Sequence, residues 1–130
     1  MAKYRLVKNE KKYWEFIRNL RTMKGVAEGF IAQRDITPKQ QEKYMLKYND
    51  CFYICLNEHE PVGYVGIIDD DIRVATHPSY QGKGVGTYMI NEIMNLNPTA
   101  IAKVKVDNEA SLKLFETCGF KKKYYILEKE

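Results

Sequence analysis

The feature that most constrains the fold of this chain is a glycine-rich turn, Gln81-Gly-Lys-Gly-Val-Gly86. It stands between a strand-like run, residues 72–76, and an amphipathic run with helical spacing that begins near Val85. Glycines at alternate positions let the backbone approach a ligand closely and point successive N–H groups at it. A helix N-terminus behind the turn adds about half a positive charge, so the pattern favours a pyrophosphate. A tight turn without a ligand is the alternative interpretation.

Two familiar phosphate-binding patterns do not fit this turn. A P-loop requires GxxxxGK followed by Ser or Thr, which the chain lacks. A dinucleotide fingerprint requires GxGxxG, whereas the glycines here are spaced as GxGxG. The turn therefore indicates a phosphate-bearing ligand without identifying it.

Hydrophobic periodicity predicts the elements around the turn. Strand patterns cover residues 3–8, 51–56, 62–68, 72–76, 101–106 and 120–127, and helical spacing covers 13–23, 37–48, 85–96 and 108–118. Thr37, Pro38 and Gln40 predict a capping box at the start of the second helix. The consecutive strands favour an antiparallel meander, and the later strand–helix–strand stretch favours a parallel crossover. We therefore predict an α/β domain with a mixed sheet and a ligand at the carboxyl ends of strands.

Length and composition indicate one folded domain. The chain has 130 residues, of which 45% are apolar and 29% are charged, so it can bury a core without disulfides. No apolar run approaches the roughly 20 residues that cross a bilayer. The first residues also show no signal-peptide pattern. We therefore expect a cytoplasmic protein that does not associate with membranes.

The net charge and the number and spacing of the cysteines limit the classes of ligand that we expect the protein to bind. The net charge of +4 can assist an anionic ligand, whether a nucleotide cofactor or nucleic acid. The one dense basic run, residues 121–123, has no aromatic-interleaved basic stripe beside it, so we expect no nucleic-acid partner. Cys51, Cys55 and Cys118 are an odd number without CxxC spacing, which predicts buried thiols and no metal site.

Two segments together resemble the GNAT superfamily of acyl-CoA N-acyltransferases. The family's phosphate motif is Gln or Arg, two residues, Gly, one residue, then Gly or Ala, and residues 81–86 match it fully. Residues 108–120, Asn-Glu-Ala-Ser-Leu-Lys-Leu-Phe-Glu-Thr-Cys-Gly-Phe, resemble the family's Asn-x-x-Ala/Ser-x-x-Leu-Tyr/Phe-x-x-x-Gly-Phe ending. The two motifs keep the family's order and spacing, and the resemblance extends over residues 51–127.

The resemblance implies a GNAT-like three-layer α/β (α+β) fold and a single acetyltransferase domain over residues 1–130. Its central mixed, mostly antiparallel sheet would have about six strands, flanked by about four helices. Acetyl-CoA would be the cosubstrate, and no metal would take part. Related folds often form homodimers, although no stretch of this sequence marks an interface.

Carried over by position, the resemblance assigns the cofactor site. Backbone amides of the turn would hold the pyrophosphate of coenzyme A, and the turn consists of Gln81, Gly82, Lys83, Gly84, Val85 and Gly86. Backbone groups of Val74 and Thr76 would pair with the pantetheine arm like an added strand. Asn108 would bind the cofactor near its thiol end, or cap a helix, or do both.

The implied reaction is direct transfer, in which an amine attacks the thioester without an acyl-enzyme. The Val74 N–H would stabilise the developing oxyanion, where a fixed donor contributes on the order of a few kcal/mol. Phe115 occupies a cofactor-contacting position where many relatives have a Tyr that protonates the departing thiolate, and Phe115 cannot do so. Either Tyr80 or Tyr88 donates instead, or the thiolate leaves unaided, which a thiol pKa of about 8.5 permits.

The candidate catalytic carboxylate follows from its spacing to the turn. In some relatives a carboxylate stands eleven residues before the Gln of the phosphate motif, and that position is Asp70 here. A slip of one position would nominate Asp69 or Asp71 instead, because strand side chains alternate between faces. A solvated acidic turn is the alternative, since an amine can also lose its proton to water.

The N-terminal third of the chain is expected to contact the acceptor amine, because it carries the polar and aromatic side chains of a small-molecule cleft. The candidates are Arg18, Asn19, Glu28, Gln33 and Tyr44. Arg18 and Asn19 with the loop that follows are similar to GNAT enzymes that acetylate nucleotide-linked amino sugars. The alternatives are acetylation of a peptide, a lysine or another small-molecule amine, a non-catalytic acyl-CoA-binding module, and a basic nucleic-acid-binding domain.

Overall fold

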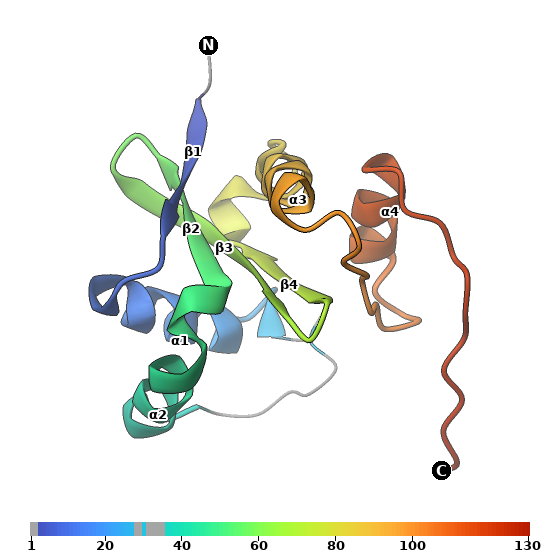
Figure 1. The fold of residues 1–130 in the computed structure, drawn as a ribbon, viewed down its shortest axis with the longest axis horizontal. Coiled ribbons are helices and arrows are strands. Elements are labelled where there is room, and N and C mark those ends of the chain that lie inside the picture. The colour runs from blue at the N-terminus through green and yellow to red at the C-terminus, as the bar shows by residue number, and fades with distance from the viewer. Residues whose placement is uncertain (1–2, 28–29, 31–35) are drawn as a thin grey trace.

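The computed structural model describes residues 3–27, 30 and 36–130, and it contains an antiparallel sheet with helices on both faces (Figure 1). The strands β1 (Tyr4–Lys8), β2 (Phe52–Asn57), β3 (Glu60–Ile68) and β4 (Asp71–Thr76) lie in the sheet in that order. The α-helices are α1 (Trp14–Thr22), α2 (Pro38–Tyr48), α3 (Val85–Leu96) and α4 (Glu109–Thr117). The short 3-10 helices η1 (Lys11–Tyr13), η3 (Asn49–Cys51) and η4 (Pro78–Tyr80) precede α1, β2 and the glycine-rich turn.

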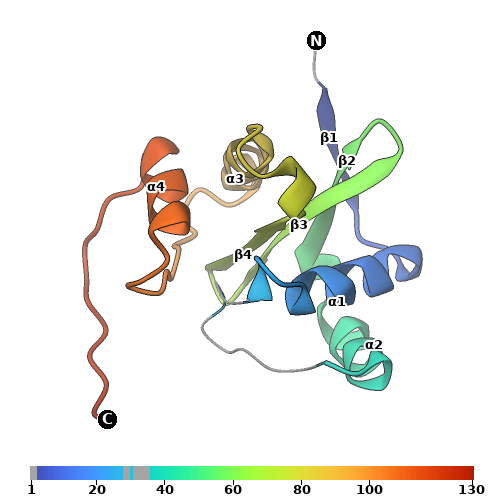
Figure 2. The same cartoon turned by 180° about the vertical axis from the view of Figure 1, so that it is seen from behind.

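The sheet separates two hydrophobic cores. Val65 of β3 belongs to the core that contains Met89 of α3, and its neighbour Tyr64 belongs to the core that contains Ile17 of α1 and Met45 of α2. Neighbouring strand residues point to opposite faces, which is why each core takes alternate positions. Figures 1 and 2 show α3 on one side of the sheet and α1 and α2 on the other. The predicted three-layer α/β arrangement is confirmed.

The predicted start of α2 is confirmed in atomic detail. The Thr37 hydroxyl accepts a hydrogen bond from the Gln40 amide at 3.1 Å, and the Gln40 side-chain oxygen accepts one from the Thr37 amide at 2.9 Å. Pro38 occupies the first turn, where its missing N–H is no loss. A cap of this kind contributes about 1 kcal/mol. In the part of the chain that the structure describes, no helix has the length and hydrophobicity to span a membrane.

The described sheet has four strands, so the prediction of about six was wrong in this respect. Of the predicted strand 101–106, only Ile101 meets β4, through a single parallel bridge to Asp71. The predicted strand 120–127 is an extended tail, and its large side chains from Tyr124 to Leu127 are 72–90% exposed. Figures 1 and 2 both place this tail on the far side of α4 from the sheet. Alternating apolar residues show that a segment can form a strand, but a strand also requires a partner backbone.

We expect Gly66→Ala to destabilise the fold. An added Cβ would lie 2.6 Å from the carbonyl oxygen of Cys51 and 2.6 Å from the ring of Phe52, and the backbone oxygen cannot move aside without disturbing β2. Overpacking of this kind should lower the free energy of unfolding by about 2 kcal/mol in a urea titration. Lys43→Ala, at an exposed site on α2, is the control and should change it by less than about 0.5 kcal/mol. Equal stability of the two variants would contradict the close packing at Gly66.

Candidate active site

The backbone of β4 bonds to β3 at alternate residues only. The amide of His77, directly after the strand, donates to the Val62 carbonyl of β3 at 2.8 Å. Hydrogen-bonded positions alternate in an antiparallel pair, so the odd-numbered residues of β4 bond to β3. The even-numbered residues present their N–H and C=O groups to the other edge. Ile72 agrees with this, because its amide donates to the Ile101 carbonyl at 2.9 Å on that other edge.

After Ile72, no described strand pairs with the outer edge of β4. The parallel bridge joins only Asp71 and Ile101, and the following residues, 102–106, diverge from β4. Val74 therefore presents its N–H to a wedge that is closed at Ile101 and opens toward the glycine-rich turn. The Thr76 carbonyl, on the same edge, accepts a hydrogen bond from the Gln81 side-chain nitrogen at 3.3 Å. An extended ligand in this wedge can pair with β4 as a further strand would.

The glycine-rich turn supplies uncovered amides at the wide end of the wedge. Gly82 and Gly84 have φ of 77° and 85°, and an added Cβ at either position would meet nothing within 4 Å. Glycine is therefore needed for the backbone path, while the space above it stays open for a ligand. Gly84 is the N-cap of α3 without a side-chain cap, and the Tyr88 amide makes the first helical hydrogen bond, to the Gly84 carbonyl at 3.0 Å. The amides that precede Tyr88 are left for an anion.

Val85 and Gly86 are buried beneath the turn. The Val85 side chain is 1% exposed and belongs to the core under α3, so only its backbone faces the turn. A Cβ on Gly86 would lie 2.8 Å from Cδ2 of Leu114, so this glycine lets α4 approach α3 closely. Lys83 lies with its ammonium 5.3 Å from the centroid of the Tyr80 ring.

Asn108 and Phe115 hold α4 in place. The Asn108 side-chain oxygen accepts a hydrogen bond from the Ser111 amide at 3.2 Å, so its predicted helix-capping role is confirmed. Phe115 is 5% exposed and packs edge-on against Phe120, with ring centroids 5.2 Å apart. Phe115 is therefore a core residue of the layer formed by α3 and α4.

The two tyrosines considered as proton donors contact other strands. The Tyr80 hydroxyl lies 3.5 Å from a carboxylate oxygen of Glu60, next to the turn between β2 and β3. Tyr88 lies against β1, where its ring centroid is 6.0 Å from that of Tyr4, and burial raises the pKa of its hydroxyl. The described contacts of both hydroxyls are therefore on the β1–β3 side and not at the free edge of β4.

The three aspartates before β4 differ in their surroundings. Asp69 and Asp70 have φ of 52° and 63° and form an exposed two-residue turn between β3 and β4. The Asp70 carbonyl accepts a hydrogen bond from the Ile101 amide at 2.8 Å, so its backbone anchors the narrow end of the wedge. Asp71 is on β4 with a side chain that is 14% exposed, and one of its carboxylate oxygens lies 3.2 Å from Nε of Arg73.

The predicted acceptor-binding residues differ in their contacts and in their exposure to solvent. Arg18 donates to the Glu15 carboxylate and, at 2.9 Å, to the Ile36 carbonyl, so it ties α1 to the start of α2. Asn19 is exposed beside it. Tyr44 is half-buried between α2 and the sheet. Glu28 and Gln33 lie outside the described residues.

Sequence reasoning did not nominate the arginine on β4, which lies on the side of the sheet that packs against α1 and α2. Arg73 precedes Val74 in the strand, so their side chains point to opposite faces. The alternation along β4 was the available signal, because the side chains that flank the Val74 backbone on the other face are Arg73 and Ala75. Arg21 of α1 meets the same region, with its guanidinium carbon 5.1 Å from the centroid of the Tyr44 ring.

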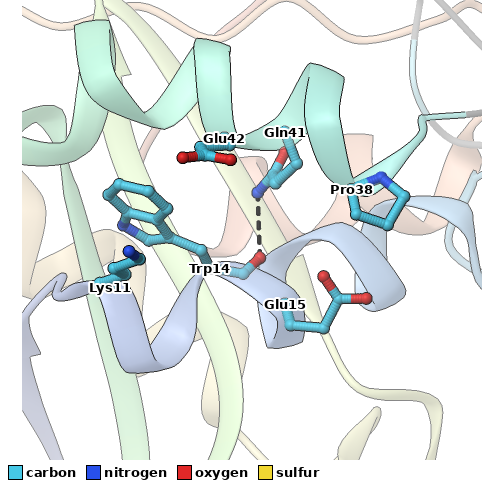
Figure 3. Close-up of a pocket in the computed structure, with 6 residues that line it drawn as sticks. All are labelled: Lys11, Trp14, Glu15, Pro38, Gln41 and Glu42. Atoms are coloured by element: carbon cyan, nitrogen blue, oxygen red, sulfur yellow. Dashed lines mark hydrogen bonds between the residues drawn. The ribbon is translucent and has the colours of Figure 1, made fainter.

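A shallow pocket between α1 and α2 is separate from these residues (Figure 3). Its lining residues are Lys11, Trp14, Glu15, Pro38, Gln41 and Glu42. The Gln41 side-chain nitrogen donates to the Trp14 carbonyl at 3.0 Å, which joins the two helices. No residue of β4 or of the glycine-rich turn lines it, so the candidate active site is the wedge beside β4. In the described ranges, no group of three or more His, Cys, Asp or Glu residues could hold a metal ion.

A backbone edge without a partner strand that leads to an uncapped helix N-terminus has the chemistry to bind an extended, phosphate-bearing ligand. Residues 13–120 match the model of the Acetyltransferase (GNAT) family. The chain belongs to this family of acetyl-CoA-dependent N-acetyltransferases. No curated protein matches the chain in sequence.

Solved structures share the fold at low sequence identity. A spermidine N-acetyltransferase from Vibrio cholerae, in complex with CoA and spermine, has a TM-score of 0.85 and 18% identity over 99% of this chain and 87% of that chain. The protein yncA from Salmonella typhimurium, with its cofactor acetyl-CoA, has a TM-score of 0.76 and 15% identity over 92% and 80%. The aminoglycoside acetyltransferase AAC(6')-Ib, in complex with coenzyme A, has a TM-score of 0.70 and 18% identity over 92% and 85%.

We expect Cys55 to resist thiol reagents in the folded protein. Its side chain is fully buried, and burial raises the pKa of its thiol to about 12, so at pH 8 roughly one molecule in ten thousand carries the thiolate. A colorimetric disulfide reagent should therefore titrate no more than two of the three cysteines until urea is added. Cys55→Ser should give the same count in the native state and one thiol fewer in urea. Rapid reaction of all three native thiols would contradict this burial.

Proposed function

We propose that this chain transfers an acetyl group directly from acetyl-CoA to the primary amine of a small molecule, in the wedge beside β4. The observation that carries the proposal is the edge of β4 at Val74 and Thr76, with which no described strand pairs and which leads to the uncapped N-terminus of α3. An extended pantetheine arm can pair with that edge, while its pyrophosphate accepts hydrogen bonds from the turn amides. One linear ligand can thus use both features.

The Val74 amide is the proposed oxyanion donor. It is fixed in a strand and aimed at the wedge, so it needs no rearrangement when negative charge develops on the thioester oxygen. A fixed donor of this kind contributes roughly a hundredfold to the rate. The face of β4 that carries the Ile72 and Val74 side chains is covered by α3, so the amine approaches from the side of α1 and α2.

The departing thiolate leaves without a dedicated acid in this proposal. Phe115 has no acidic proton to donate, and it is buried in the core. The side chains of Tyr80 and Tyr88 contact other strands. A thiol with a pKa of about 8.5 is an adequate leaving group near neutral pH. No cysteine is needed as a nucleophile either, since burial raises the pKa of both Cys55 and Cys118.

We favour Asp71 over Asp70 as the carboxylate that receives the proton of the attacking amine. Asp70 is exposed in a turn, whereas Asp71 lies on the acceptor side of β4 with little exposure. Val74 lies three residue steps along the strand from Asp71, roughly 10 Å, so the proton would pass through water.

The small-molecule class of acceptor is supported by the solved structures. Two of the matching folds are an acetyltransferase for spermidine and one for aminoglycosides, which are small amines. The nucleotide-linked amino sugar suggested by Arg18 and Asn19 has no counterpart among the substrates named for these structures, and we retain it only as one acceptor to test.

Release of coenzyme A thiol from acetyl-CoA is the test of turnover. We expect release with at least one panel among amino acids, amino sugars, nucleotide-linked amino sugars, polyamines and aromatic amines, and mass spectrometry should show the acetylated amine. Release with peptides alone would contradict the small-molecule assignment. Binding of acetyl-CoA without transfer to any amine would favour a non-catalytic binding module.

The same assay can test the glycine-rich turn. We expect Gly84→Ala to raise the KM for acetyl-CoA about tenfold, because a Cβ at a φ of 85° costs roughly 1–2 kcal/mol and displaces the amides. Gly119→Ala is the matched control, since Gly119 has a φ of 95° and open space for its Cβ but lies after α4. An equal change in both variants would indicate general strain and not a cofactor site.

We expect Asp71→Asn to lower kcat/KM at least tenfold for every accepted amine, in line with the usual effect of losing a general base. Asp70→Asn should stay within about twofold, because Asp70 is solvated and Asn tolerates its positive φ. Steady-state kinetics with neutral and charged acceptors provide the comparison. A larger loss in Asp70→Asn would restore the assignment made from sequence spacing.

A further inference from the structure

Two arginines, Arg73 and Arg21, lie on the side of the sheet that packs against α1 and α2. Arg73 lies on the same side of β4 as Ala75, which packs in the core shared with α1 and α2. Arg21 comes from α1, which lies against β3 and β4. Its guanidinium carbon is 5.1 Å from the ring centroid of Tyr44.

The positive charges of Arg73 and Arg21 are only partly neutralised by the carboxylates that the structure describes. Asp71 lies 3.2 Å from Nε of Arg73, and the Arg73 side chain is still 42% exposed. Arg21 forms no ion pair with any carboxylate that the structure describes. Among the described carboxylates, Asp71 thus pairs with Arg73, the residue directly before Val74, and none pairs with Arg21.

Two tyrosines lie within electrostatic reach of both arginines. Burial raises the pKa of Tyr44 and of Tyr64, and the charges of Arg21 and Arg73 both act to lower it. Both guanidiniums are therefore within electrostatic reach of the same phenols. A phenol hydroxyl can also donate a hydrogen bond to an oxyanion bound between the arginines.

We propose that the acceptor carries a carboxylate or a phosphate as well as its amine, and that Arg73 and Arg21 bind this anionic group while the amine faces Val74. This inference rests on the proposed function. A guanidinium holds such groups through parallel N–H donors, which fixes their orientation as well as their position. A polycationic acceptor would place ammonium groups beside the same guanidiniums, so the pair selects against it. The overall charge of +4 also attracts anions.

The test uses amines that differ only in the anionic group. Ethanolamine with phosphoethanolamine, glucosamine with glucosamine 6-phosphate, and alanine methyl ester with alanine are suitable pairs, and spermidine serves as the polycation. We expect at least one anionic member to exceed its neutral partner about tenfold or more in kcat/KM. Arg73→Gln and Arg21→Gln should each reduce that preference about tenfold, measured within each variant as the ratio of kcat/KM for the anionic member to kcat/KM for its neutral partner. Arg5→Gln, which removes one exposed charge on β1 at the opposite edge of the sheet, should leave the preference unchanged.

Binding measurements keep this inference separate from the proposed function. Calorimetry with the full chain and coenzyme A should show that phosphoethanolamine or alanine binds more tightly than its neutral partner, and that Arg73→Gln removes the difference while Arg73→Lys keeps part of it. Such binding without turnover would support the anion site and refute the transferase proposal. Equal or tighter binding of the neutral or polycationic members, or equal losses for all acceptors in Arg73→Gln, would overturn the anion site. Thermal unfolding of each variant establishes that it is folded.

Discussion

The geometry of this protein depends on one parallel bridge between β4 and the chain that follows α3. Ile101 donates to the Asp70 carbonyl and accepts from the Ile72 amide, and beyond that residue the two backbones separate. If the pairing continued, protein would occupy the outer edge of β4 and no ligand could pair with it. Because the pairing stops, Val74 and Thr76 keep their backbone groups directed into a wedge. The antiparallel alternation with β3 then decides which residues face it.

The glycines of the turn serve different physical needs within one short motif. Gly82 and Gly84 adopt a left-handed backbone that leaves the amides at the start of α3 uncovered. Gly86 instead removes a side chain where Leu114 of α4 comes close. The motif therefore fixes the path of the backbone and also the distance between α3 and α4, and both are needed to form the wide end of the wedge.

The two faces of the sheet differ in polarity and have different roles in the proposed function. On the face of α3, the buried ring of Phe115 packs against the partly buried ring of Phe120, and a hydroxyl at position 115 would need a partner in that apolar setting. On the face of α1 and α2, Arg73 lies beside Asp71, and Arg21 lies against the ring of Tyr44. In our proposal, the cofactor thus binds along the outer edge of β4, and the anionic group of the acceptor binds on the face of the sheet that packs against α1 and α2.

Much of the fold was predictable because it depends on local patterns. The capping box at Thr37, the hairpins among β2, β3 and β4, and the glycine-rich turn before α3 each follow from the periodicity or conformational freedom of neighbouring residues. The family resemblance also rested on two contiguous motifs, and the family is confirmed. What the sequence could not determine was pairing between distant segments. Residues 101–106 have the alternation of a strand, but their distance from β4 beyond Ile101 is set by the packing of α3 and α4, as is the position of the tail. For the same reason, only the tertiary structure could place Arg21 of α1 on the side of the sheet to which Arg73 of β4 points, because no local pattern encodes which helix packs on which face.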